Sequence, residues 1–262
     1  MLLWKSQNRE ADAQQGCLGL YSLRPPESEI LDNGYREEAM ERNVKASGYW
    51  GGEPMTILSL FDHTGNALRP WARDGHECLA VDLQNAGEVE HFGAGSIRYL
   101  QADVRMFAPP LDVEFCCAFP PCTHLAGSGA RWWAAKGAQA LEDALDLVHT
   151  CRRIMEATGA PWYLENPVGR LSTCWRKPDH YIQPWEYGGY LGGESDGYTK
   201  KTGLWTGGGF LLPEPRPIPL AADHDRIYRC APGPNRANIR SATPQGWAQA
   251  VYETNGYLEE NR

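Results

Sequence analysis

The sequence predicts an α/β protein built on a doubly wound, mostly parallel sheet. Two observations support this class: several short segments are almost entirely apolar, and helical or turn segments separate them along the chain. Strands that are nearly all apolar are typical of a parallel sheet covered by helices on both faces. The chain has 262 residues, of which 42% are hydrophobic, which is enough for one large domain with a substantial core.

Five strands are predicted within the main domain, which we expect to cover residues 53–206. They lie at residues 55–61, 77–84, 97–107, 112–119 and 161–167. A short helix, closed by Gly75, is expected over 67–75. A longer helix is expected over 138–159, because its apolar residues recur at helical spacing.

The segments on either side of this domain differ from it in composition. Residues 1–52 are polar and irregular and are expected to form an arm with a short helix at 35–46. After residue 170 the chain is rich in Gly, Pro, aromatic and basic residues, with strands expected at 181–189 and 199–208. The proline-rich segment 210–219 is expected to be extended.

The end of the chain is predicted to return to helix. Residues 207–240 are expected to form a reduced linker region, and 241–262 a terminal segment whose helix begins at Pro244. Thr243, which precedes that proline, is a suitable N-cap residue.

The composition excludes several classes of protein. No segment approaches the roughly 20 apolar residues of a membrane span, and the N-terminal residues lack the apolar run of a signal peptide. The eight cysteines lack the spacing of a disulfide framework, so we expect reduced thiols, a cytoplasmic location and a monomer. A net charge of −8 argues against a passive DNA coat, but it permits a local basic strip that faces a substrate.

Polar residues follow the ends of the first three predicted strands, where ligands bind in doubly wound sheets. Gly65 lies in the turn after the first strand, Asp82 ends the second, and Asp103 lies near the end of the third. The turn has one glycine rather than the three of a dinucleotide site, which favours an adenosine ligand without a pyrophosphate, such as S-adenosylmethionine. The alternative is a set of ordinary loops with incidental acids.

A thiol and a carboxylate follow the next two strands. Cys122 lies in a rigid Pro-Pro turn after the fourth strand, where nearby donors could ionise it for nucleophilic attack. Glu165 ends the adjacent fifth strand, where a carboxylate among aromatic residues has to be paired or protonated. The alternatives are a cysteine that only packs in a loop and a structural acid in a salt bridge.

Two other site types fit the sequence poorly. Cys116 and Cys117 are expected to point to opposite faces of a strand, and with Cys122 and His124 they lack the C-x-x-C spacing of a zinc site. No metal is therefore expected. A Ser/His/Asp hydrolase is disfavoured because no G-x-S-x-G motif is present.

Four motifs, in this order, resemble the DNA cytosine-5 methyltransferases, most closely the compact homologues of phage and prophage genomes. They are "LSLFDHTGNALRPWARDGHECLAVD", "FPPCTH", "WYLENP" and "YTKKTGLWTGG". The similarity covers about residues 55–256 and implies a Rossmann-like, S-adenosylmethionine-dependent methyltransferase fold with a small C-terminal region facing DNA. The partner it implies is cytosine-containing DNA in a bacterial host.

The resemblance implies a covalent mechanism on a cytosine flipped out of the duplex. Cys122 would attack carbon 6, and Glu165 would protonate nitrogen 3, so that carbon 5 accepts the methyl group. Lys201 matches the first basic residue of the family's basic motif and completes the catalytic set.

The cofactor would be held mainly at the ends of the first three strands. Phe61 would lie against the adenine, Asp82 would bind the ribose hydroxyls and Asp103 the adenine amino group. The full set implied for the cofactor is Phe61, Thr64, Gly65, Asp82, Leu83, Asp103, Val104, Pro120, Ser241 and Thr243.

The DNA side of the site would include the loop after the nucleophile. This loop would close over the base, with Gly127 and Gly129 as hinges. The residues implied to contact DNA are Thr123, Arg131, Asn166, Arg170 and Lys200. Only about 35 residues separate "TGG" from "ATPQG", so we expect a short or relaxed target sequence.

Two departures from the family pattern leave alternatives open. His63 stands where the family's first turn has a glycine, and Gly203 stands where its basic motif has a second arginine. One alternative is the same scaffold with a modified S-adenosylmethionine or another cytosine-containing acceptor. The other is a catalytically silent DNA-binding relative.

Overall fold

The computed structural model describes residues 53–191 and 195–256. The predicted arm over 1–52 and its helix at 35–46 therefore lie outside the described residues. No described helix is both long and apolar enough to cross a membrane.

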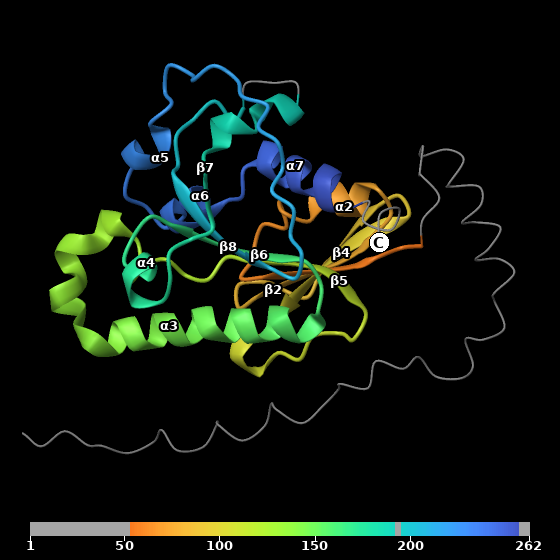
Figure 1. The fold of residues 1–262 in the computed structure, drawn as a ribbon, viewed down its shortest axis with the longest axis horizontal. Coiled ribbons are helices and arrows are strands. Elements are labelled where there is room, and N and C mark those ends of the chain that lie inside the picture. The colour runs from red at the N-terminus through yellow and green to blue at the C-terminus, as the bar shows by residue number, and fades with distance from the viewer. Residues whose placement is uncertain (1–52, 192–194, 257–262) are drawn as a thin grey trace, which may run out of the picture. The chain divides into compact units, whose positions relative to one another are not determined.

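Eight strands of the described chain form one mostly parallel sheet, as Figure 1 shows. They are β1 (Thr56–Leu60), β2 (Glu77–Asp82), β3 (Val89–Phe92), β4 (Gly95–Gln101), β5 (Val113–Ala118), β6 (Trp162–Pro167), β7 (His180–Ile182) and β8 (Thr202–Gly207). Their order across the sheet is β3-β4-β2-β1-β5-β6-β8-β7. The five central strands, β4 to β6, pair in parallel and correspond to the five predicted ones.

The edges of the sheet are antiparallel. β3 pairs with β4 at one edge, and β8 pairs with β6 and β7 at the other. β3 was not predicted, because it has only four residues and two of them, Glu90 and His91, are polar. β2, β4 and β3 lie on one side of β1, and β5 and all later strands lie on the other. The strand order therefore reverses between the neighbouring strands β1 and β5, which is where ligands bind in such sheets.

Helices cover both faces of the sheet. The α-helices are α2 (Arg69–Arg73), α3 (Trp133–Thr158), α4 (Leu171–Cys174), α5 (Arg226–Arg229), α6 (Arg236–Ser241) and α7 (Gln245–Asn255). The 3₁₀ helices are η2 (Val104–Met106), η3 (Gly127–Trp132), η4 (Pro184–Glu186) and η5 (Gly188–Tyr190). In Figure 1, α3 runs along one face, and α2 and α7 lie on the other.

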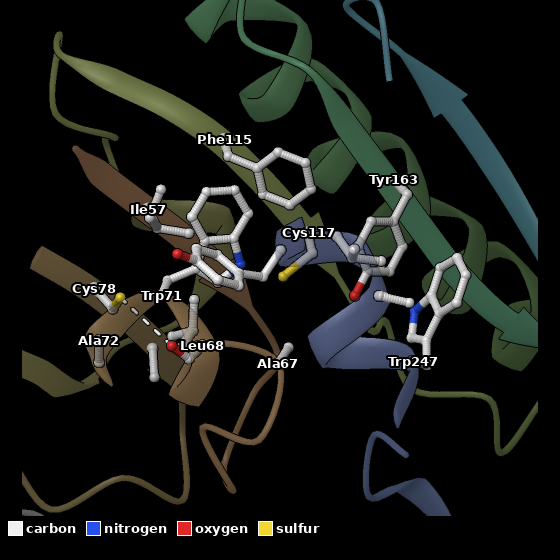
Figure 2. Packing of buried hydrophobic residues seen from close by; sticks show 14 of the residues in the cluster. Ile57, Ala67, Leu68, Trp71, Ala72, Cys78, Phe115, Cys117, Tyr163 and Trp247 are labelled. Carbon is white, nitrogen blue, oxygen red and sulfur yellow. Dashed lines mark hydrogen bonds between the residues drawn. The ribbon is translucent and has the colours of Figure 1, made fainter. Parts of the chain in front are cut away.

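The core is divided into two clusters by the sheet. Figure 2 shows the cluster under α2 and α7, where the rings of Trp71 and Phe115 stack with their centroids 4.9 Å apart. Trp247 of α7 meets Tyr163 edge-on in the same cluster. The second cluster packs against α3. Strand alternation places Cys117 in the first cluster and its neighbour Cys116 in the second, as expected.

The long helix confirms the predicted apolar stripe, with a break at its start. Gly137 has a φ of 77° and is not helical, so regular helix begins at residue 138, where it was predicted to begin. The buried face includes Val148, Cys151 and Met155. The helix ends at Gly159, whose φ of 71° is the left-handed conformation that glycine adopts without strain.

Three predictions in the second half need correction. The strand expected over 181–189 ends at residue 182, because Pro184 starts the 3₁₀ helix η4. The final helix begins at Gln245 rather than at Pro244, which is extended with a ψ of 135°. Thr243 is therefore too far from the first turn to cap it, and α7 has no side-chain cap. The segment 210–219 forms neither helix nor strand, as expected.

Candidate active site

Among the described residues, a pocket of about 1180 Å³ opens at the carboxyl edge of the central strands. Its walls come from the turns that follow β1, β2, β5 and β6, from the residues before β8, and from α5, α6 and the segment before α7. The pocket therefore spans the point where the strand order reverses between β1 and β5.

The turn after β1 is held in an unusual conformation. Phe61 lines the pocket and has a φ of 58°, and it is the one non-glycine residue of the described chain with a positive φ. For an aromatic residue this conformation costs of order 1–3 kcal/mol, and such strain concentrates at functional sites. Gly65 also has a positive φ, and a Cβ there would lie 2.4 Å from the hydroxyl oxygen of Tyr99, so the turn requires glycine.

Asp62, which was not among the predicted site residues, organises this turn. Its carboxylate accepts hydrogen bonds from the backbone amides of Thr64 at 3.1 Å and Gly65 at 2.7 Å, and from the Ser59 hydroxyl at 2.9 Å. Burial raises the pKa of Asp62, although these hydrogen bonds act in the opposite direction. The signal in the sequence was an acid two residues before Thr64-Gly65, a spacing typical of an Asx turn.

The two predicted adenosine-binding acids have different surroundings. Asp82, at the end of β2, is 8% exposed and lines the pocket, and its Oδ1 accepts the backbone amide of Gln84 at 2.8 Å. Asp103 does not line the pocket: it caps η2 and forms an ion pair with Arg105, with Oδ2 and Nη2 2.7 Å apart. Of the two, Asp82 is the one available to a ligand.

The Cys122 turn and the end of β6 are tied together by hydrogen bonds. Asn166, 1% exposed, donates from Nδ2 to the carbonyl of Pro120 at 2.9 Å. A second link is an isolated antiparallel bridge between Ala126 and Gly169. These links fix the position of the nucleophile's turn relative to Glu165.

The Cys122 thiol is half-buried, and its pKa is raised. Burial is the main cause, and the charge of Glu165 raises the pKa further. Lys200 and Arg240 act in the opposite direction with smaller effects. This direction runs against the expectation that nearby donors ionise the thiol, because the turn removes it from water as well as displaying it.

Glu165 is paired, as its strand requires, and its partner is Lys200. The Lys200 Nζ lies 3.5 Å from Glu165 Oε1, and the two side chains are 10% and 8% exposed. Lys201, predicted for the catalytic set, is exposed, and its ammonium lies over the ring of Tyr181 at 4.7 Å. Both lysines line the pocket, and Lys200, which was expected to contact DNA, pairs with the Glu165 carboxylate.

Most of the predicted residues meet in this one pocket. Those that line it are Phe61, Thr64, Asp82, Pro120, Cys122, Thr123, Arg131, Glu165, Asn166, Lys200, Lys201, Ser241 and Thr243. The others do not line it. They are Gly65, buried under Tyr99; Leu83, which is 58% exposed; Asp103; Val104, buried in the core; and Arg170, whose guanidinium lies over the Trp133 ring.

The loop after Cys122 forms the 3₁₀ helix η3, which carries Arg131 and the 55% exposed Trp132 along the pocket. The predicted hinges, Gly127 and Gly129, do not have positive φ angles. Gly137, at the junction with α3, has one and has open space around it. The glycine of this segment that breaks the regular helical backbone is therefore Gly137.

The sequence matches no protein-family model and no curated protein. Within residues 53–191 and 195–256, no group of three or more His, Cys, Asp or Glu side chains is arranged to hold a metal ion. The function of the chain is therefore inferred from the geometry of the pocket.

That pocket also contains residues that the sequence did not single out for it. Arg240 of α6 and Tyr228 of α5 line it, although both lie in the segment 207–240 that was predicted to be a linker. No local pattern around them indicates a site. Only the folding of this segment over the carboxyl edge brings them there.

Proposed function

We propose that this chain is a DNA cytosine-5 methyltransferase, with a Rossmann-like methyltransferase fold, that acts through a covalent cysteine adduct. The observation that carries the proposal is that Cys122, in the turn after β5, and Glu165, near the end of the adjacent parallel strand β6, line one pocket. Hydrogen bonds between their turns hold the two groups in register. The strand order and the helices on both faces are compatible with that fold.

The residue types suit attack on an aromatic ring. Carbon 5 of cytosine is a poor nucleophile until sulfur adds at carbon 6 and the ring loses its aromaticity. As the Cys122 sulfur bonds to carbon 6, its thiol proton is lost to solvent. Glu165, protonated for this step, gives its proton to nitrogen 3 and becomes a carboxylate, so the ring gains the sulfur without net charge. Lys200, which pairs with Glu165, stabilises the carboxylate that this transfer leaves.

Several residues fit the nucleoside part of the cofactor. Both hydrogen bonds that Gln84 donates to Asp82 go to Oδ1, which leaves Oδ2 of this carboxylate for a ligand. Phe61 lines the same pocket. The Oδ1 atom of Asn166 is a buried acceptor without a partner among the described residues, which suits a ligand amino group. S-adenosylmethionine supplies an electrophilic methyl group when it is bound.

The mouth of the pocket suits DNA. Arg131, Trp132 and Lys201 are exposed there, which provides cations for phosphates and a ring for a base. A cytosine has to leave the duplex to reach Cys122, at a cost of a few kcal/mol. Few side chains lie beyond the pocket to contact base edges, which favours a short or relaxed target sequence.

A modified methyl donor is the second candidate, and His63 favours it. Its exposed side chain lines the pocket where the related enzymes have a glycine, and its Nδ1 lies 3.2 Å from Asn85 Oδ1. A side chain at this position alters the space available to the donor. A catalytically silent relative is disfavoured, because both reactive side chains are present.

The test is to incubate the protein with S-adenosylmethionine and cytosine-containing DNA, digest the DNA and analyse its nucleosides by mass spectrometry. The expected product is 5-methyl-2′-deoxycytidine. Cys122→Ser is expected to abolish the product while cofactor binding, measured by calorimetry, survives; Cys174→Ser, at an exposed position outside the pocket, is the matched control. Full activity of Cys122→Ser would refute the mechanism. A mass other than one added methyl would favour a modified donor, and no product would favour the silent relative.

A further inference from the structure

Arg240 is a cation of the pocket that has no role in the proposed mechanism. It lies on α6, in the segment that folds over the carboxyl edge of the sheet, and it lines the same pocket as Cys122. Its Nε is buried and has no hydrogen-bond partner within the described residues. A buried guanidinium nitrogen without an acceptor is costly, unless an anion forms beside it during function.

The other cation near the thiol is already committed. Lys200 forms its ion pair with Glu165 at 3.5 Å, and both side chains are almost fully buried. Its charge is therefore largely balanced by the carboxylate. Among the described residues, no ion pair is recorded for Arg240, so its charge is available to a new anion.

The anion that forms in this pocket is the thiolate. Burial and the charge of Glu165 raise the pKa of Cys122, so sulfur attack requires the loss of a proton that the surroundings retain. Arg240 opposes both effects, because its positive charge lowers the pKa of this thiol. The remaining titratable and charged groups that line the pocket are Asp62, His63, Asp82, Arg131, Lys201, Tyr228 and Arg236.

We propose that Arg240 is a positioning residue for the nucleophile: its otherwise unpartnered guanidinium stabilises the thiolate of Cys122 as the proton leaves. This inference rests on the proposed function, which makes Cys122 the nucleophile. It assigns a catalytic contribution to a segment that the sequence predicts to be a linker between the catalytic core and the final helix.

The test is the alkylation of Cys122 by iodoacetamide in the full chain, without DNA or cofactor. The thiol loses its proton to the buffer, the thiolate sulfur bonds to the carbon of the reagent, and iodide leaves. Because iodoacetamide is neutral, Arg240 does not attract the reagent itself. Peptide mass spectrometry separates Cys122 from the exposed Cys174, whose rate serves as the internal reference.

Rates are measured from about pH 7 to about pH 10, where thiols titrate. Arg240→Gln is expected to move the Cys122 profile to higher pH and to slow alkylation near neutrality by about threefold to tenfold. Arg240→Lys, which keeps the charge, is expected to retain most of the rate. Arg236→Gln is the matched control: Arg236 lies one turn earlier on α6 and lines the pocket, but its Nε donates to the Cys230 carbonyl at 2.8 Å.

Three results would overturn the inference. They are an unchanged profile in Arg240→Gln, an equal loss in Arg240→Lys, and an equal loss in Arg236→Gln, which would assign the effect to α6 as a whole. His63 lines the same pocket, but it is common to all the variants and therefore cancels in the comparison. Methyl transfer is not measured in this experiment, so its result is distinguishable from a failure of the proposed function.

Discussion

Replacing Gly169 by alanine tests the link between the turn that carries Cys122 and the one that follows Glu165. A Cβ at this position would lie 2.0 Å from the carbonyl oxygen of Leu125 and 2.8 Å from the amide nitrogen of Gly127. Both are backbone atoms, so no side-chain rotation relieves the overlap. The two loops have to separate by about 1 Å to reach the shortest ordinary contact.

The separation acts on two backbone hydrogen bonds. Gly127 donates to the Val168 carbonyl and Arg170 donates to the Leu125 carbonyl, each at 2.9 Å. At about 0.5–1.5 kcal/mol each, their loss lowers the free energy of unfolding by about 1–3 kcal/mol. For a domain of this size the melting temperature then falls by about 2–12 °C. The protein still folds, because this is a fraction of a typical domain's stability.

The expected effect on function is larger than the effect on stability. A displacement of about 1 Å between catalytic groups reduces turnover by about a hundredfold. Thermal and urea unfolding followed by circular dichroism measure the effect on stability, and the yield of 5-methyl-2′-deoxycytidine measures the effect on function. Gly129→Ala is the control in the same loop, since its Cβ would meet nothing closer than the Thr123 carbonyl oxygen at 3.9 Å. If Gly169→Ala matched wild type in melting temperature and yield, the coupling of the two loops would be refuted.

Two further predictions concern the charged groups of the pocket. Lys200→Met is expected to lower the free energy of unfolding by about 3 kcal/mol in urea titrations, because it leaves Glu165 buried without its partner, whereas Lys201→Met should have little effect. Equal losses in both variants would contradict the assigned pairing. Burial raises the pKa of Asp62, so the folded state binds a proton more readily than the unfolded state, and the stability this provides is lost as pH rises through the raised pKa. Wild type should therefore gain stability relative to Asp62→Asn as the pH falls from neutrality toward the ordinary carboxyl pKa of about 4; a difference that is constant over this range would contradict the raised pKa.

The central sheet could be predicted from the sequence because its signal is local. Each buried parallel strand is a short apolar run, and all five such runs became neighbouring strands. Parallel strands present their carboxyl ends at one edge, so Cys122 and Glu165 could be assigned to one site before their distance was known. The edge strand β3 was missed because a short, half-exposed strand leaves little pattern.

What the sequence did not determine depends on register and on contacts between distant segments. Lys200 and Lys201 are adjacent and chemically equivalent, and neighbouring residues of an extended chain point in opposite directions. Only the position of this segment against β6 makes Lys200 the partner of Glu165. In the same way, Arg240 reaches the pocket because the segment before α7 folds over the carboxyl edge.

The sequence by itself determined the central sheet and the edge at which Cys122 and Glu165 lie. The tertiary structure decided which cation pairs with the Glu165 carboxylate, which of the two predicted acids lines the pocket and how deeply the Cys122 thiol is buried. The physical reason is that strand formation follows from the local apolar pattern, whereas burial and pairing of charge depend on groups that only folding brings together.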